Sequence, residues 1–232
     1  MQGGYSPPAP FLGGHLNFSL GWGFGYNDSS ATITLNNPPL VLSRADSVAG
    51  ITDLYPTVSL AWNAGTSNFM VYGTGDAPIG AYDPARFANI GIGHGAADLG
   101  GGYTYLDPAK GHEFTAVVGF TFNTENPSTH YINGVDAHLD WAASQFLSQH
   151  WLVGVAGYVY DQLSGDSGSG NRVGAFESKV AAAGPEVGYL FALGGRPAYI
   201  NARAYWEFDA THRVEGHAVM ATLNFPLGKG AK

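Results

Sequence analysis

A histidine between two aspartates, here called the acidic triplet, is the first feature that could carry chemistry. Asp136, His138 and Asp140 alternate with two apolar residues. Carboxylate and imidazole groups are common ligands of divalent metals, so the residue types would suit a metal site. In a β-strand, however, successive residues on one face lie about 6 to 7 Å apart. Three such side chains do not readily meet one small ion, and we predict neither a metal centre nor another cofactor.

A second set offers the residue types of a hydrolase. His15, Asn17 and Ser19 also alternate along the chain. A catalytic base must lie within hydrogen-bond distance of its nucleophile, and alternate positions of one strand do not provide that geometry. The sequence has no recognisable nucleophile motif, and we predict that the protein is not an enzyme.

The segments that carry these residues have a period of two. Across residues 12–26 the even positions read Leu, Gly, Leu, Phe, Leu, Trp, Phe and Tyr, whereas the odd positions hold only Gly, His, Asn and Ser. Soluble strands usually stop near five or six residues, and a strand that crosses a membrane needs about 9 to 11. The segment therefore predicts a transmembrane β-strand. A soluble β-sandwich would also alternate, but strands of this length argue against it.

The alternation recurs along the chain, giving about ten strands. We expect them near residues 12–26, 53–63, 69–79, 94–105, 113–123, 135–141, 151–162, 180–193, 198–209 and 219–225. Long connections (27–50, 80–90, 124–134 and 163–178) alternate with short ones (64–68, 107–110, 148–150 and 194–197). Outer-membrane barrels combine short periplasmic turns with longer external loops. The pattern predicts one all-β domain over residues 1–232, an antiparallel transmembrane β-barrel with both termini in the periplasm.

The ends of this domain lead to two further expectations. Residues 1–10 are expected to form a periplasmic stub, and residues 229–232 a C-terminal tail. Unpaired strand edges are costly in hydrocarbon, so a closed ten-stranded barrel must pair its first strand, 12–26, with its last, 219–225.

The amino-acid composition limits the kinds of molecule that the protein can bind. Charged residues make up 12% of the chain, yet no stretch is apolar for the roughly 18 to 20 residues that a membrane helix needs. The net charge of -8, with 10 Lys and Arg, gives no basis for binding nucleic acid. The chain has no cysteine. We expect outer-membrane lipid or detergent around the barrel, contacted at the membrane interface by Trp22, Phe24, Tyr26, Trp62, Tyr103, Tyr105, Trp141, Trp151 and Trp206.

Polar residues on the opposite face are the candidate pore lining. They are Asp53, Asp76, His94, Asp98, Glu113, Asp136, His138, Asp140, Tyr160, Gln162, Glu186, Arg203, Tyr205 and Glu207. Charges inside a small barrel must be paired or hydrated, so these residues can form salt-bridge networks, line a narrow path, or do both. Arg203 stands among more acids than cations, and we expect Glu186, Glu207 or Glu113 to hold it.

Seven short segments carry a family resemblance. They are residues 12–14, 75–82, 122–126, 129–140, 157–162, 184–189 and 212–216. In this order they resemble the outer-membrane channels of the MetA pathway of phenol degradation, and the resemblance runs from about residue 11 to 228. That family looks twelve-stranded, so the first hairpin would be absent here.

The resemblance also implies a function, which is passive uptake of small hydrophobic or aromatic molecules through the barrel lumen. Two alternatives stay open, an outer-membrane lipid hydrolase or deacylase and a structural or adhesive barrel whose loops bind partners. Alternation and composition show a barrel but not its cargo. The transported molecule, its exit route and the oligomeric state are not decided by the sequence.

Overall fold

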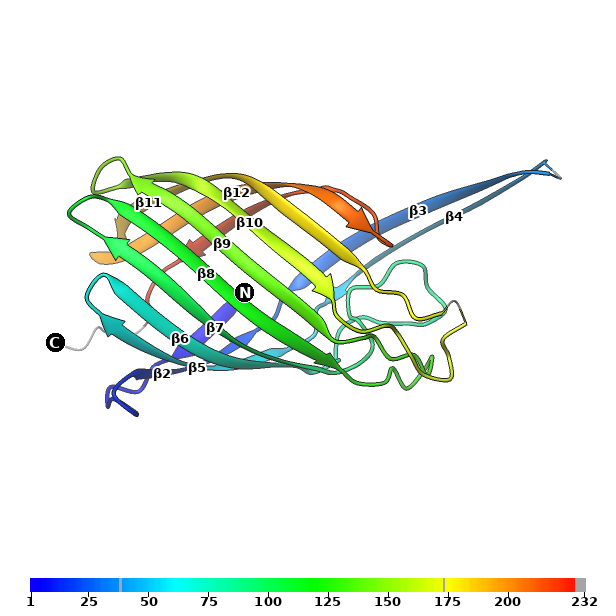
Figure 1. Cartoon of the computed structure of the whole chain (residues 1–232), viewed down its shortest axis with the longest axis horizontal. Helices are drawn as coiled ribbons and strands as arrows, with labels where there is room; N and C mark the ends of the chain where they lie inside the picture. The colour runs from blue at the N-terminus through cyan, green and yellow to red at the C-terminus, as the bar shows by residue number, and fades with distance from the viewer. Residues whose placement is uncertain (38, 173, 228–232) are drawn as a thin grey trace.

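The computed structural model describes residues 1–37, 39–172 and 174–227, and these residues fold into antiparallel β-structure (Figure 1). The strands are β1 (Gln2–Tyr5), β2 (His15–Gly21), β3 (Phe24–Asn36), β4 (Pro39–Ile51), β5 (Tyr55–Ala64), β6 (Ser67–Asp76), β7 (Ala96–Asp107), β8 (His112–Asn123), β9 (Asp136–Phe146), β10 (Trp151–Gln162), β11 (Lys179–Leu193), β12 (Arg196–Thr211) and β13 (His217–Asn224). The described residues contain no helix long and apolar enough to cross a membrane. The predicted tail, residues 229–232, lies outside the described residues.

One curled sheet forms the body of the molecule. It has 11 strands in the order β1-β2-β5-β6-β7-β8-β9-β10-β11-β12-β13, and each strand is antiparallel to its neighbours. Short turns join β5 to β6, β7 to β8, β9 to β10 and β11 to β12 at one end, and the longer connections lie at the other (Figure 1). The predicted all-β antiparallel class is confirmed.

The register of the ladders separates two faces of the sheet. Residues directly opposite each other on adjacent strands point to the same side, so each ladder extends a face by one strand. Val118 pairs with Leu139, which pairs with Val159. The same face is apolar and exposed across the sheet, with Val58, Phe69, Val71, Leu99, Phe120, Val153, Val155, Val187 and Ile200. Such a surface suits contact with lipid hydrocarbon.

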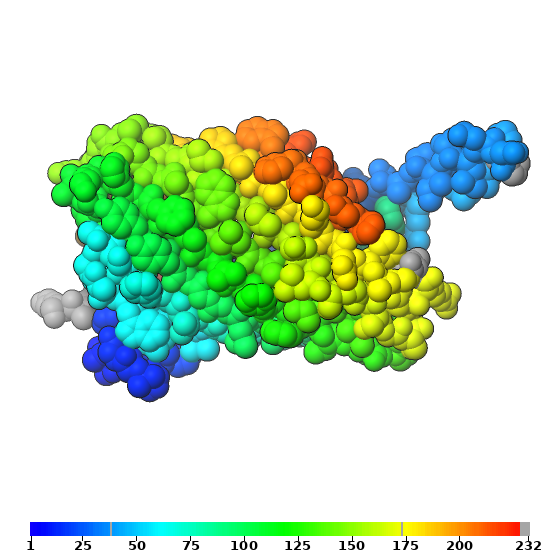
Figure 2. Space-filling view, viewed as in Figure 1, coloured from blue at the N-terminus to red at the C-terminus, as the bar shows by residue number. Residues whose placement is uncertain are grey.

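The expected first strand bends in its middle. β2 ends at Gly21, and the chain resumes as β3 after Trp22 and Gly23. We expected residues 27–50 to be a loop, but residues 27–36 and 39–50 instead form most of the hairpin β3–β4, which is paired from Phe24 opposite Ile51 to Asn36 opposite Pro39. The reason lies in the outer half, where threonines alternate with aliphatic residues that favour strands. This hairpin stands out from the body at the long-loop end (Figures 1 and 2).

The two edges of the sheet correct two further expectations. Residues 1–10 are not only a stub, because β1 pairs with β2 from Gln2 opposite Gly21 to Tyr5 opposite Phe18. β2 has β1 and β5 as its neighbours, so the predicted pairing of the first long strand with β13 is wrong for the described residues. In an order of 11 antiparallel strands the first and last run in the same direction. A cleft of about 900 Å³ is lined by the two edges, with Met1 and Gln2 on one and Ala221 to Asn224 on the other.

Candidate functional site

The polar side chains gather on the face opposite the apolar one. Several hydrogen bonds there skip a strand or more, among them Tyr72 Oη to His138 Nε2 at 3.3 Å, Ser144 Oγ to Glu186 Oε1 at 3.2 Å, and Tyr158 Oη to Glu207 Oε1 at 2.8 Å. They join β6 to β9, β9 to β11 and β10 to β12. Side chains of non-adjacent strands meet in this way on the concave side of a curled sheet. We call this side the inner face.

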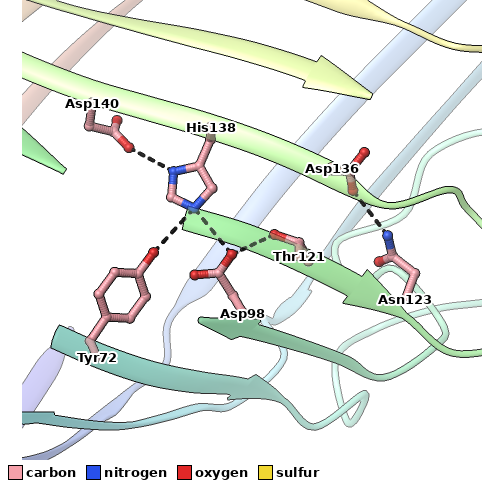
Figure 3. A network of polar contacts seen from close by, with 7 residues as sticks. All are labelled: Tyr72, Asp98, Thr121, Asn123, Asp136, His138 and Asp140. Atoms are coloured by element: carbon pink, nitrogen blue, oxygen red, sulfur yellow. Dashed lines mark hydrogen bonds and ion pairs between the residues drawn. The ribbon is translucent and has the colours of Figure 1, made fainter. Parts of the chain in front are cut away.

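A histidine bound by two carboxylates stands on the inner face, two residues after the start of β9 (Figure 3). His138 Nε2 lies 3.1 Å from Asp98 Oδ2, and its Nδ1 lies 3.1 Å from Asp140 Oδ2. Thr121 donates a hydrogen bond to the same oxygen of Asp98 at 2.7 Å. A carboxylate only accepts, so a doubly protonated imidazole satisfies both contacts whereas a neutral ring satisfies one. The cluster is therefore a stable arrangement for a charged histidine.

Two glycines make room for this cluster. Tyr72 crosses over β7 and β8 to reach His138 on β9. A Cβ on Gly100 would lie 2.6 Å from the Tyr72 hydroxyl, and a Cβ on Gly119 would lie 2.2 Å from it. Any larger residue at either position would push the tyrosine away from the histidine.

The predicted acidic triplet divides between two sets of partners. Asp140 contacts His138 although the two alternate along one strand. Asp136 instead accepts hydrogen bonds from Asn123 Nδ2 at 3.0 Å and from Tyr160 Oη at 2.5 Å. The three groups therefore do not converge on one point, and within residues 1–37, 39–172 and 174–227 no group of three or more metal-ligating side chains is placed to hold an ion.

Arg203 is held by one of the three acids that the sequence suggested. Arg203 Nε forms an ion pair with Glu186, whose side chain is 3% exposed while that of Arg203 is 38% exposed. Glu207 is not a partner of Arg203, because it accepts a hydrogen bond from Tyr158 and lies 4.0 Å from Arg213. Arg203 also lines a cavity of about 230 Å³ together with Glu113, Thr115, Val117, Asp140 and Tyr205.

Two predicted pore-lining residues, Asp53 and His94, lie outside the strands, and a third, Gln162, stands at the end of one. Asp53, 1% exposed, accepts hydrogen bonds from the backbone N–H of Gly80 at 2.7 Å and of Ile92 at 2.9 Å. His94 belongs to the connection between β6 and β7. Gln162, the last residue of β10, donates to Phe176 O at 2.9 Å in the connection that follows. The period-two pattern had extended the expected strands back to Asp53 and His94, two residues before β5 and β7 begin, whereas Gln162 ends β10 where that strand was expected to end.

The remaining candidates lie where the register predicts the inner face. Asp76 shares its face with Tyr72 and Thr74 on β6, and its Oδ1 is buried without a hydrogen-bond partner in the described part of the chain. Tyr205 is buried, and its ring centroid lies 5.3 Å from that of Tyr158. Tyr72 and Ser144 were not among the predicted residues, because their neutral side chains carry no charge to mark them. Counting back by two from Asp76 would have found Tyr72.

The predicted interface aromatics fall at both ends of the strands, with one exception. Trp62, Tyr103, Tyr105 and Trp151 lie near the short turns, and Trp151 packs against Tyr189 with ring centroids 4.7 Å apart. Trp22, Phe24, Tyr26 and Trp206 lie toward the other end. Trp141 is the exception, since it stands in the middle of β9, opposite Ala116 and Gly157.

Comparison with known proteins places the chain in a family. Residues 2–223 match the model of the family described as the MetA-pathway of phenol degradation. The chain belongs to this family. The fold is similar to a crystal structure described as the COG4313 outer membrane channel from Pseudomonas putida F1, with a TM-score of 0.69, 12% sequence identity, and coverage of 93% of this chain and 77% of that chain. At this identity the likeness shows a shared fold. The comparison with curated proteins gave no match.

Proposed function

We propose that the protein is a passive channel of the outer membrane for small hydrophobic or aromatic solutes, which cross along the inner face. The observation that carries the proposal is the two-sided sheet, whose outer face is apolar and exposed while its inner face holds the polar and charged groups. That is the reverse of a soluble barrel and the arrangement expected in lipid. The family's description links it to phenol degradation, and the similar structure is described as a channel.

In this proposal residues 1–232 form one barrel domain, and the short-turn end faces the periplasm. The described chain ends at the short-turn end (Figure 1). Met1 instead pairs with Trp22, just after the last residue of β2, through hydrogen bonds of 2.6 and 2.8 Å. Lipid surrounds the apolar face, and neither a cofactor nor a nucleic acid takes part.

The charges of the inner face define which solutes pass. Carboxylates outnumber cations there: the acids are Asp98, Glu113, Asp136, Asp140, Glu186 and Glu207, and their cationic partners are Arg203, Arg213 and the bound imidazole of His138. In a confined path such an excess repels anions. Neutral aromatic molecules therefore pass more readily than aromatic carboxylates.

Uptake in intact cells tests the proposal, because a lipopolysaccharide leaflet is the barrier that such solutes meet. We expect a Gram-negative host that expresses the chain to take up a radiolabelled phenol faster than cells with an empty vector, and to take up labelled benzoate no faster. Conductance in planar bilayers should show a reversal potential that favours cations. Uptake equal to the vector control, or release of fatty acid from vesicles, would contradict a passive channel.

A further inference from the structure

A second cavity lies in the loops at the long-loop end, away from the inner-face clusters. It is open to solvent, has a volume of about 440 Å³ and lies between the connections 77–95 and 124–135. Its walls are Tyr82, Ile92, His94, Asn126, Thr129, Tyr131 and Asn133. Small-molecule sites usually measure about 300 to 1,000 Å³ and combine apolar walls with a few fixed polar groups. This cavity meets both conditions.

The two connections are held in place by buried hydrogen bonds. Asp53 binds both ends of the first connection through the N–H groups of Gly80 and Ile92. Gly95 and Thr124 join the first connection to the second, with a backbone bond of 2.9 Å and a side-chain bond of 3.0 Å. The cavity is therefore formed before any ligand arrives, which lowers the entropy cost of binding.

One wall of the cavity is a tyrosine whose hydroxyl is already used. Tyr131 donates its hydrogen to Asp166. Burial, together with this carboxylate, raises the pKa of Tyr131 to about 12. The ring therefore stays neutral and offers the cavity an aromatic surface, not a charge.

Two other groups remain able to bind a hydroxyl. His94 Nδ1 lies 3.1 Å from the carbonyl oxygen of Gly95, which can only accept, so Nδ1 carries the hydrogen and Nε2 of the neutral ring is an acceptor. Tyr82 Oη accepts a hydrogen bond from Asn126 Nδ2 at 2.9 Å, and its own hydrogen can be donated elsewhere. The cavity thus presents one acceptor and one donor.

The positions of these groups are defined by their surroundings. Asn126 is buried, and its Oδ1 accepts the N–H groups of Ser128 at 3.0 Å and Thr129 at 3.2 Å, so its amide nitrogen faces Tyr82. Gly93 has a φ of +76°, and a Cβ there would lie 2.4 Å from the Tyr82 ring. Only glycine suits this position, and its missing side chain lets the Tyr82 ring pack directly on the backbone beside His94.

We propose that this loop cavity binds a hydroxylated aromatic ring in its neutral form before the solute reaches the inner face. A phenol donates one hydrogen bond and accepts another, which matches His94 and Tyr82, while Ile92 and Tyr131 offer the cavity's apolar and aromatic surfaces to its ring. The cavity walls include no Lys or Arg among the described residues, so a phenolate or a benzoate finds no counter-ion. This inference rests on the proposed function, because it names the solute and the place of its capture.

Binding to the detergent-solubilised full chain tests the cavity directly. The probe is 4-fluorophenol followed by fluorine NMR, with fluorobenzene and 4-fluorobenzoate as comparison ligands. We expect 4-fluorophenol to bind the wild type more tightly than either. Asn133→Trp, at an exposed wall position, should weaken binding about tenfold by filling the cavity, and His94→Ala should weaken it roughly two- to tenfold through one lost hydrogen bond. Gln149→Trp in the turn between β9 and β10 is the matched control and should bind like the wild type.

Uptake by cells, measured with the same variants, distinguishes the two proposals. If the wild type takes up phenol but binds 4-fluorophenol no more tightly than Asn133→Trp does, the proposed binding site is wrong and the proposed channel function is supported. The expected binding pattern without uptake would support the cavity and overturn the channel. If His94→Ala fails to show the heat-dependent gel mobility of a folded barrel, Asn133→Trp alone decides the outcome.

Discussion

The two central residues of β8 offer a direct test of which face meets lipid. Val117 and Val118 are the sixth and seventh of its 12 residues, so they lie at nearly the same depth and point to opposite sides. Val118 is 46% exposed and stands opposite Leu139 on the apolar face. Val117 stands opposite Asp140 and lines the cavity that also contains Glu113. The native residue is valine at both positions, so the same substitution can be compared directly.

An arginine at these two positions should have very different effects. On the lipid face near the bilayer centre it costs about 2 to 4 kcal/mol, which lowers the folding equilibrium constant about 30- to 700-fold. On the inner face the guanidinium finds the carboxylates of Asp140 and Glu113, and we expect Val117→Arg to cost less than about 1 kcal/mol. Val118→Arg should therefore lose stability and Val117→Arg should keep most of it.

Reversible urea unfolding from lipid vesicles, followed by tryptophan fluorescence, measures the difference. The midpoint should fall strongly for Val118→Arg and little for Val117→Arg, with gel mobility as a check on folding. Equal losses for the two variants would show that depth, not facing, sets the cost. A larger loss for Val117→Arg would reverse the assignment of the faces and refute the proposed route.

Three other perturbations test separate parts of the structure. Arg203→Ala leaves the carboxylate of Glu186, 3% exposed, without its cation; we expect a loss of about 2 to 4 kcal/mol in the same urea assay and stronger cation selectivity in planar bilayers, with Arg203→Lys as the control. Asp53→Ala removes the carboxylate that binds both ends of the connection 77–95, so proteolysis within these residues should speed up while the sheet stays folded. Asp46 accepts N–H bonds from Ala88 and Phe87, which lower its pKa below 3.8. The stability that Asp46 contributes is therefore fully present above pH 3.8, and it is lost only as the pH falls through the lower pKa of Asp46 in the folded protein. A rise in hydrogen exchange at the Phe87 amide already between pH 6 and 5 would contradict this contact.

The sequence by itself determined the faces of the strands and the class of the fold. A period of two assigns each residue to a side whatever its neighbours are, which is why Val118 and Leu139 could be placed on the apolar face, and Asp136 and Arg203 on the polar one. The alternation of short and long connections likewise follows from composition, because turn residues interrupt the pattern wherever a strand must reverse. These are local properties of the chain.

Tertiary structure alone decided which polar groups meet. The distance from Tyr72 to His138 depends on the register of three ladders and on two glycines that let the tyrosine pass. The break after Gly21 and the long hairpin β3–β4 depend on pairing between segments, which a single strand's pattern does not contain. Asp53 and His94 carry the same polar signal as wall residues, yet Asp53 binds the distant N–H groups of Gly80 and Ile92, and His94 lies in the connection 77–95 beside them. The side of the sheet to which a residue points is set within one strand. Which side chains touch depends on the register of several strands, and only the folded sheet fixes that register.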